Sequence, residues 1–71
     1  MLVDCKTSAR KTFPLTRLEE NQIYAFERFR ATNNDNCFVA ILYNNKCYLV
    51  PYMALKMAKT INLEEHNEYL Y

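Results

Sequence analysis

Two apolar runs near the middle of the chain predict a β-hairpin. Cys37 to Tyr43 and Lys46 to Val50 are rich in β-branched and aromatic residues, which favour strands. The residues between them, Asn44-Asn45, suit a two-residue turn of the mirror-image type. A third, shorter strand is predicted from Leu2 to Lys6, where the residue types allow two alternating faces.

A helix is predicted between the first strand and the hairpin. Thr7 to Leu15 contains small, basic and proline residues and is expected to be a loop. Thr16 begins the sequence Thr-Arg-Leu-Glu, which has the spacing of a capping box, so we expect Thr16 to be the N-cap and the helix to run from about Leu18 to Ala31. The predicted apolar face of this helix consists of Leu18, Gln22, Ala25, Phe26 and Phe29.

The last third of the chain predicts short helices. Pro51 ends the hairpin and suits the start of a helix from Tyr52 to Lys59, and Asn62 is expected to cap a last helical stretch that ends near Tyr69. The expected fold class is therefore α+β: a three-stranded sheet with a β-hairpin, one main helix and short C-terminal helices, in one small domain, 1–71. The side chains expected to be most buried are Phe26, Phe29, Val39, Ile41 and Leu49.

Composition excludes several classes of protein. The chain has 71 residues, of which 51% are hydrophobic and 14% aromatic, and this excludes intrinsic disorder. Its longest apolar run, Phe38 to Tyr43, is too short to span a membrane, and the N-terminus has no signal-peptide pattern, so we expect a cytoplasmic location. The chain has no glycine and hence no glycine-rich phosphate loop, and turns that need positive φ should use asparagine.

Cysteine usage indicates a reducing compartment and no cofactor. Three cysteines without paired spacing do not predict a disulfide framework. The hairpin turn would place Cys37 and Cys47 on opposite sides of the sheet, so these two could not bind the same ion. Zinc bound by fewer of the candidate ligands, or between two molecules, stays open as an alternative to buried free thiols. The candidate ligands are Cys5, Cys37, Cys47 and His66.

An ordered series of short motifs resembles a nuclease family. Asp4-Cys5-Lys6 is an acid-x-Lys motif on a strand, Lys11 begins the sequence Lys-Thr-Phe-Pro-Leu, and Gln22 begins a Gln-Ile pair on the helix. The apolar hairpin and its Val-Pro-Tyr step into a helix follow in order. From Val3 to about Lys59 the chain thus resembles the second half of RecU-type Holliday junction resolvases, in the PD-(D/E)xK nuclease superfamily.

The resemblance implies a reduced nuclease core and a role for the acid-x-Lys pair. In the family the carboxylate binds a divalent ion and the lysine orients water or stabilises charge on the phosphate. The family also uses an acidic residue upstream, whereas only Met1, Leu2 and Val3 precede Asp4 here. We therefore expect Asp4 and Lys6 to be remnants and the chain not to be an enzyme. The alternative for the pair is an exposed charge pair on an edge strand.

The two ends of the chain carry opposite charge, although the net charge is only +1. The N-terminal part carries four basic residues that could bind nucleic acid, and the alternative is a solvated loop. The C-terminal part is acidic and ends in tyrosines, so it could bind a basic groove of a protein; the alternative is an ordinary acidic helix. The candidate nucleic-acid-binding residues are Lys6, Arg10, Lys11 and Arg17. The candidate partner-binding residues are Tyr24, Tyr52, Glu64, Glu65, Glu68, Tyr69 and Tyr71.

Three functions are compatible with these features. The first is a noncatalytic interaction protein, encoded by a phage or mobile element, that inhibits a host nucleic-acid-processing protein; an anti-CRISPR protein acting on an effector nuclease is an example. The second is a DNA-binding accessory of recombination that uses the basic loop. The third is a Holliday junction resolvase completed by a partner chain.

Overall fold

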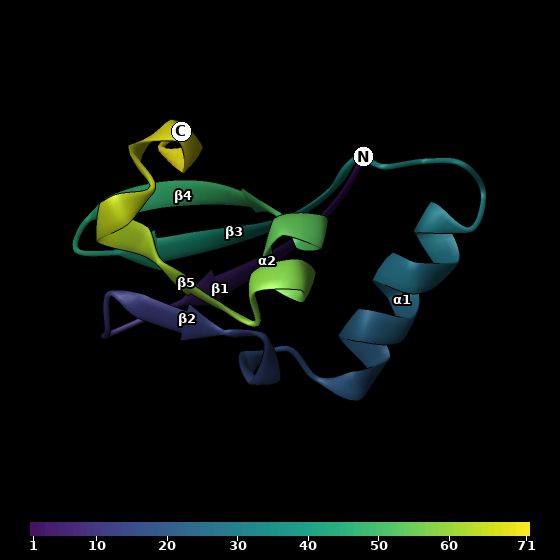
Figure 1. The fold of residues 1–71 in the computed structure, drawn as a ribbon, viewed down its shortest axis with the longest axis horizontal. Coiled ribbons are helices and arrows are strands. Elements are labelled where there is room, and N and C mark those ends of the chain that lie inside the picture. The colour runs from purple at the N-terminus through teal and green to yellow at the C-terminus, as the bar shows by residue number, and fades with distance from the viewer.

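A computed structural model describes all residues from Met1 to Tyr71 and has an α+β fold (Figure 1). The five strands are β1 (Leu2–Thr7), β2 (Thr12–Pro14), β3 (Cys37–Tyr43), β4 (Lys46–Pro51) and β5 (Thr60–Asn62). The two helices are α1 (Glu20–Arg30) and α2 (Tyr52–Ala58), and short 3-10 turns cover Leu15–Arg17, Leu63–Glu65 and Asn67–Tyr69. The predicted fold class is confirmed.

The main sheet has the strand order β1-β3-β4. β1 is parallel to β3, and α1 connects the two strands. β3 and β4 form the predicted antiparallel hairpin, in which Leu42 is paired with Cys47. Asn44 and Asn45 have φ values of 52° and 61°, as a mirror-image turn requires. The hairpin prediction is therefore confirmed in position, register and turn type.

A second sheet, formed by β2 and β5, lies where the sequence predicted a loop. These short strands are antiparallel, with Phe13 paired to Ile61. Both side chains are buried, and Phe13 is 0% exposed. The loop prediction for Thr7 to Leu15 is thus wrong at Thr12–Pro14, because the strand depends on a partner near the other end of the chain.

Helix α1 begins later than the capping box at Thr16 predicted. Its N-cap is Glu19, whose side chain accepts from the backbone N–H of Gln22, while the Gln22 side chain accepts from the backbone N–H of Glu19 at 2.9 Å. Thr16 lies instead in the 3-10 turn before the helix, and Leu18 is buried in extended backbone. The true capping box is thus shifted by three residues, from Thr16 to Glu19.

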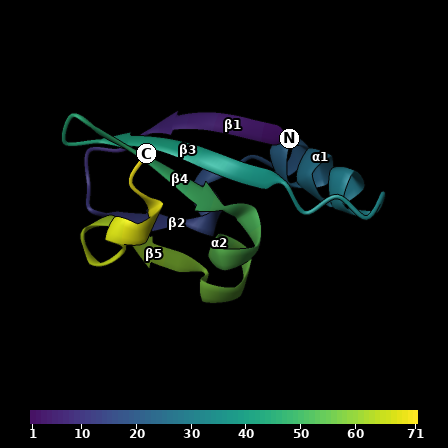
Figure 2. The ribbon, with the colours of Figure 1, turned by 90° about the horizontal axis from the view of Figure 1, so that it is seen from above.

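The core lies between one face of the main sheet and the layer formed by α1, α2 and the β2–β5 sheet (Figure 2). Of the side chains predicted to be most buried, Phe26, Val39 and Ile41 are confirmed. Phe29 and Leu49 are only half-buried, so the prediction was wrong for both. The prediction is wrong for Leu49 because its side chain points to the other face of the sheet, which no element covers. That outer face also carries Val3 and Leu42, which are 38% and 50% exposed.

The C-terminal segment departs from the predicted helix. Helix α2 follows Pro51 as expected, and Lys59 ends it with a positive φ of 69°. Asn62 is an N-cap, since its side chain accepts from the N–H of Glu64 at 3.1 Å, but it opens 3-10 turns instead of an α-helix. The chain then reaches β4, where the N–H of Tyr71 donates to Cys47. Neither helix has the length and hydrophobicity needed to cross a bilayer.

Candidate nucleic-acid interface

The acid-x-Lys pair lies on the inner face of β1 and is less exposed than a surface charge pair. The side chains of Asp4 and Lys6 are 26% and 17% exposed, and 3.9 Å separates Lys6 Nζ from Asp4 Oδ2. Gln22 on α1 donates through Nε2 to Asp4 Oδ1 at 3.1 Å. Asp4 Oδ2 is buried and accepts no hydrogen bond. The alternative of an exposed pair is therefore wrong, although β1 is an edge strand as that alternative required.

The candidate zinc ligands are dispersed. Cys37 is buried on the inner face of the sheet, where burial raises the pKa of its thiol. Cys47 lies on the opposite face, as the hairpin register predicted, and Cys5 shares that outer face but is two strands away. The His66 ring is 2.9 Å from Glu68, near the C-terminus. No group of three or more His, Cys, Asp or Glu side chains is placed to hold a metal ion.

The basic loop forms a hollow after the end of β1. Arg10 and Arg17 line this hollow together with the hydroxyl-bearing Ser8 and Thr12, and its volume is about 310 Å³. The loop is ordered locally, since Ser8 Oγ donates to the carbonyl of Arg10 at 2.7 Å and accepts from its N–H at 3.2 Å. Two guanidinium groups and two hydroxyls around one hollow are the donors that bind phosphate oxygens.

Arg17 is held in place at the wall of the hollow. Its Nη2 donates to the carbonyl of Thr7 at 2.9 Å, and its guanidinium carbon lies 5.1 Å from the centre of the Phe13 ring. Arg17 also lines a second, larger hollow of about 460 Å³ on the outer face of the sheet, together with Leu42 and Cys47. Two of the four predicted basic residues, Arg10 and Arg17, therefore line the loop hollow, whereas the Lys6 side chain lies beside Asp4 on the inner face.

The fourth basic residue, Lys11, lies beside the acidic C-terminal segment. β2 is paired with β5, and the N–H of Leu63 donates to the carbonyl of Lys11 at 2.7 Å. Glu64 and Glu65 follow immediately and are exposed. The sequence predicted two oppositely charged ends, but the small sheet brings them together. The positive field at Lys11 is therefore partly cancelled, and the basic surface is centred on the two arginines.

The acidic side chains make local contacts. The Tyr43 hydroxyl donates to Glu64 Oε2 at 2.6 Å, and this hydrogen bond to a carboxylate raises the pKa of Tyr43. Glu65 accepts from the Asn62 side chain at 3.2 Å. The hydrogen bond with His66 lowers the pKa of Glu68. All three carboxylates are nonetheless exposed and accessible to a partner.

The candidate tyrosines fall into two groups. Tyr24 is 63% exposed and Tyr71 is 92% exposed, so both could contact another molecule. Tyr69 is half-buried and its ring stacks on His66, with 5.2 Å between the ring centres. Tyr52 is only 1% exposed, so the prediction that it belongs to a binding surface is wrong. It follows Pro51 at the start of α2, where its ring points into the core and stacks on Phe26.

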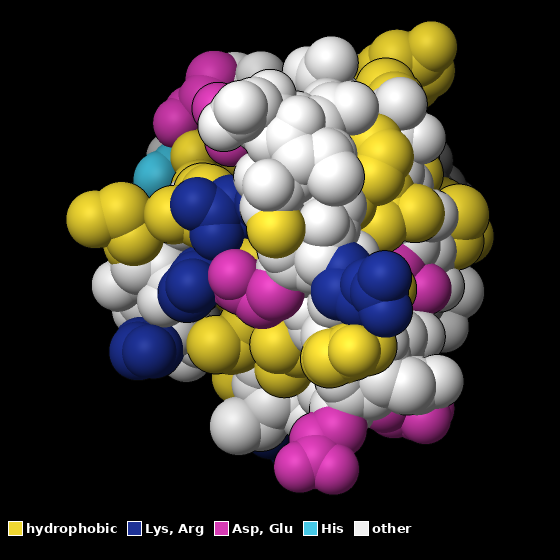
Figure 3. All heavy atoms as spheres, turned by 90° about the vertical axis from the view of Figure 1, so that its right-hand side faces the viewer, with side chains coloured by type: hydrophobic (Ala, Val, Ile, Leu, Met, Phe, Trp, Pro, Cys, Tyr) yellow, Lys and Arg dark blue, Asp and Glu magenta, His cyan; other side chains and the backbone are white.

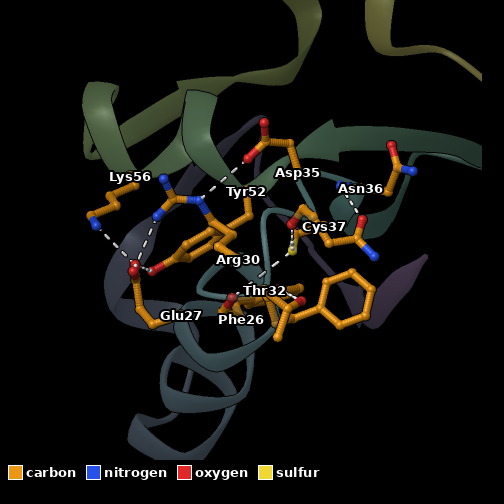
Figure 4. A network of polar contacts seen from close by, with 11 residues as sticks. Phe26, Glu27, Arg30, Thr32, Asp35, Asn36, Cys37, Tyr52 and Lys56 are labelled. Carbon is orange, nitrogen blue, oxygen red and sulfur yellow. Dashed lines mark hydrogen bonds and ion pairs between the residues drawn. The ribbon is translucent and has the colours of Figure 1, made fainter.

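Tyr52 belongs to a polar network that the sequence did not reveal (Figure 4). Its hydroxyl donates to Glu27 Oε2 at 2.7 Å, and Lys56 donates to the same oxygen at 2.8 Å. Arg30 donates to Glu27 Oε1 at 3.1 Å. These contacts, with Lys56 first, lower the pKa of Glu27, while burial and the bond to Glu27 raise the pKa of Tyr52 far above its usual range.

The network pairs Arg30 of α1 and Lys56 of α2 with one acidic side chain. Lys and Arg side chains adjoin acidic ones on the face that carries α1 (Figure 3). Glu27 accepts from both Lys56 and Arg30, so it connects α1 with α2 and offsets their charge. The only signal for it in the sequence is the spacing of Glu27 and Arg30, one helical turn apart. Arg30 and Lys56 are thus paired with an acidic group, whereas Arg10 and Arg17 of the loop after β1 form no ion pair.

Comparison with known proteins does not identify a family. No protein-family model matches the chain, and no curated protein or solved structure matches it either.

Proposed function

We propose that this chain binds the phosphate backbone of nucleic acid through the loop after β1, without cleaving it. The observation that carries the proposal is the hollow lined by Arg10, Arg17, Ser8 and Thr12. A guanidinium group can donate two parallel hydrogen bonds to the oxygens of one phosphate. Serine and threonine hydroxyls commonly add further contacts. The fixed position of Arg17 against Thr7 and Phe13 reduces the entropy lost on binding.

Such an interface binds the backbone and does not read bases. Two to four phosphate contacts give weak, salt-sensitive binding, because each contact releases a counterion. The acidic residues beside Lys11 should keep the duplex on the side of the hollow and away from the β2–β5 sheet. The role that fits is an accessory of recombination in the cytoplasm, where free thiols such as Cys5 stay reduced.

The test compares two pairs of substitutions that remove the same charge. Arg10→Gln with Arg17→Gln should lower the affinity for a four-way junction or duplex at least tenfold at 50 mM salt. Arg28→Gln with Lys46→Gln removes two exposed basic groups elsewhere and should change the affinity for the same DNA less than threefold. Equal losses for the two pairs, or unchanged binding in the first pair with its melting temperature preserved, would refute the proposed interface.

The noncatalytic part of the proposal is supported by the surroundings of Asp4. Its carboxylate is bonded to Gln22 and lies near Lys6, and no further acidic group completes a metal-binding cluster there. A single carboxylate is a weak site for magnesium, which proteins usually bind through one or two carboxylates together with phosphate oxygens. Four-way junctions should therefore stay intact with magnesium or manganese. Cleavage that is lost in both Asp4→Asn and Lys6→Ala would show that the chain is a nuclease.

A second candidate function is inhibition of a host nucleic-acid enzyme, such as a CRISPR effector nuclease. It is favoured by the exposed carboxylates of Glu64, Glu65 and Glu68, which lie near the exposed Tyr71. An acidic surface with an aromatic tip suits a positively charged nucleic-acid channel. Tyr71→Ala should then raise the dissociation rate from such a nuclease more than it lowers the association rate. Met57→Ala, at an exposed position of α2 outside the candidate partner-binding set, is the control.

A further inference from the structure

We propose that a second copy of this chain pairs with the free edge of β1, antiparallel and centred on Cys5, to form a two-fold symmetric dimer. β1 lies at the edge of the main sheet, with β3 on one side and no strand on the other. The unpaired backbone groups of such an edge are a template for another strand. This inference is independent of the proposed nucleic-acid interface.

The hydrogen-bonding pattern fixes which residues of β1 face a second strand. The N–H of Ser8 donates to Leu42 of β3 at 2.9 Å, so in the parallel ladder the even-numbered residues direct their amides toward β3. Val3, Cys5 and Thr7 therefore direct their backbone N–H and C=O groups outward. The Thr7 carbonyl accepts a hydrogen bond from the Arg17 side chain at one of its two lone pairs. The free edge therefore runs from Val3 to Thr7.

Only one antiparallel register of β1 with itself opposes unlike charges. With Cys5 opposite Cys5, Asp4 of each copy lies directly across from Lys6 of the other. A shift of two residues places Asp4 opposite Asp4 or Lys6 opposite Lys6, and a shift of one residue puts the amides out of phase. Because opposite charges across strands stabilise pairing and like charges destabilise it, the charges select the register centred on Cys5.

The same register accounts for an unsatisfied atom. Asp4 Oδ2 is buried and has no hydrogen-bond donor, and its own Lys6 ammonium is 3.9 Å away, too far for a hydrogen bond. Lys6 of the second copy would approach Asp4 on the same inner face of the sheet. On the outer face, the exposed Val3 and Cys5 would join the apolar side chains of a continuous six-stranded sheet.

The first test uses the position of Cys5. Hydrogen-bonded antiparallel pairs have a Cα–Cα distance of about 5.5 Å, which a disulfide can span. Diamide, which takes up two electrons and two protons from two thiols, should therefore convert the wild-type protein to a dimer joined through Cys5. Cys5→Ser should abolish that product, and Cys47→Ser, on the same outer face, should keep it. A cross-link that maps to Cys47 would overturn the proposal.

The second test reverses the charges and needs no cross-link. In sedimentation equilibrium, Lys6→Asp alone should weaken the dimer about tenfold or more, because it opposes two carboxylates at two symmetric positions. The double variant Asp4→Lys with Lys6→Asp should restore the dimer. For the wild-type protein, slower hydrogen exchange of the Cys5 amide at higher protein concentration gives a readout that does not depend on any variant folding. A wild-type protein that stays monomeric at 0.5 mM, or a dimer that both charge variants leave unchanged, would refute the pairing.

Discussion

Replacement of Phe26 by alanine should unfold most of the protein, whereas the same replacement at Phe29 should leave it folded. Both side chains lie on α1, one helical turn apart. Phe26 is 1% exposed, and its ring stacks on Tyr52 with 4.6 Å between ring centres and 17° between planes. Phe29 is half-buried and packs against the edge of the core. The sequence had suggested Phe29 as a core residue, so this pair tests the fold directly.

The magnitudes follow from burial. Truncation of a buried phenylalanine to alanine costs about 3–5 kcal/mol, because the transfer free energy is lost and a cavity is left beside the Tyr52 ring. A half-buried ring should cost roughly half of that. A domain of this size is stable by roughly 4–10 kcal/mol in total. The loss at Phe26 therefore approaches the whole stability at the lower end of this range, where a chain of only 71 residues is expected to lie. Alanine's higher helix propensity is the same in both variants and cancels in the comparison.

The assay is urea unfolding followed by far-ultraviolet circular dichroism and tyrosine fluorescence. The wild-type and Phe29→Ala proteins should give cooperative transitions, with the midpoint of Phe29→Ala lower and the slope unchanged. Phe26→Ala should be largely unfolded without denaturant, or should unfold at the lowest urea concentrations. Equal midpoints for the two variants, or a larger loss at Phe29, would refute the placement of Phe26 in the core.

Three further predictions concern charge and backbone. The pKa of Glu27 is lowered from 4.5, so its stabilising contribution is present above the unfolded pKa and is lost as pH falls through the folded pKa. Acidification from pH 7 to 3 should therefore lower the free energy of unfolding of the wild type more than that of Glu27→Gln, as measured by urea titration. The difference between the two losses should be less than about 1 kcal/mol, because the Glu27–Lys56 pair is partly exposed. Glu64→Gln with Glu65→Gln should strengthen DNA binding measured by fluorescence anisotropy, since these carboxylates lie beside the basic loop; unchanged binding would place the DNA elsewhere. Lys59→Gly should raise the melting temperature, because Lys59 has a φ of 69° and glycine relieves about 1 kcal/mol of backbone strain.

Much of the local structure could be predicted from the order of residues. The hairpin followed from two β-rich runs around Asn44-Asn45, since the turn residues and the alternation act over a few positions. The cap at Asn62 and the start of α2 after Pro51 are equally local. The start of α1 was misplaced because Thr16 and Glu19 offer competing caps, and only the buried position of Leu18 decides between them.

The candidate site required the tertiary structure. The sequence identified Arg10 and Arg17 as basic but could not place them around one hollow, because that hollow depends on the position of the loop and β2 after β1. Lys11 lies beside the acidic segment for the same reason, through the pairing of β2 with β5. The network around Glu27 likewise joins residues of two helices. Local propensity and alternation act over a few residues and are legible in the sequence. Pairing between distant strands and ion pairs between helices depend on how the chain closes on itself, so only the folded structure decides them.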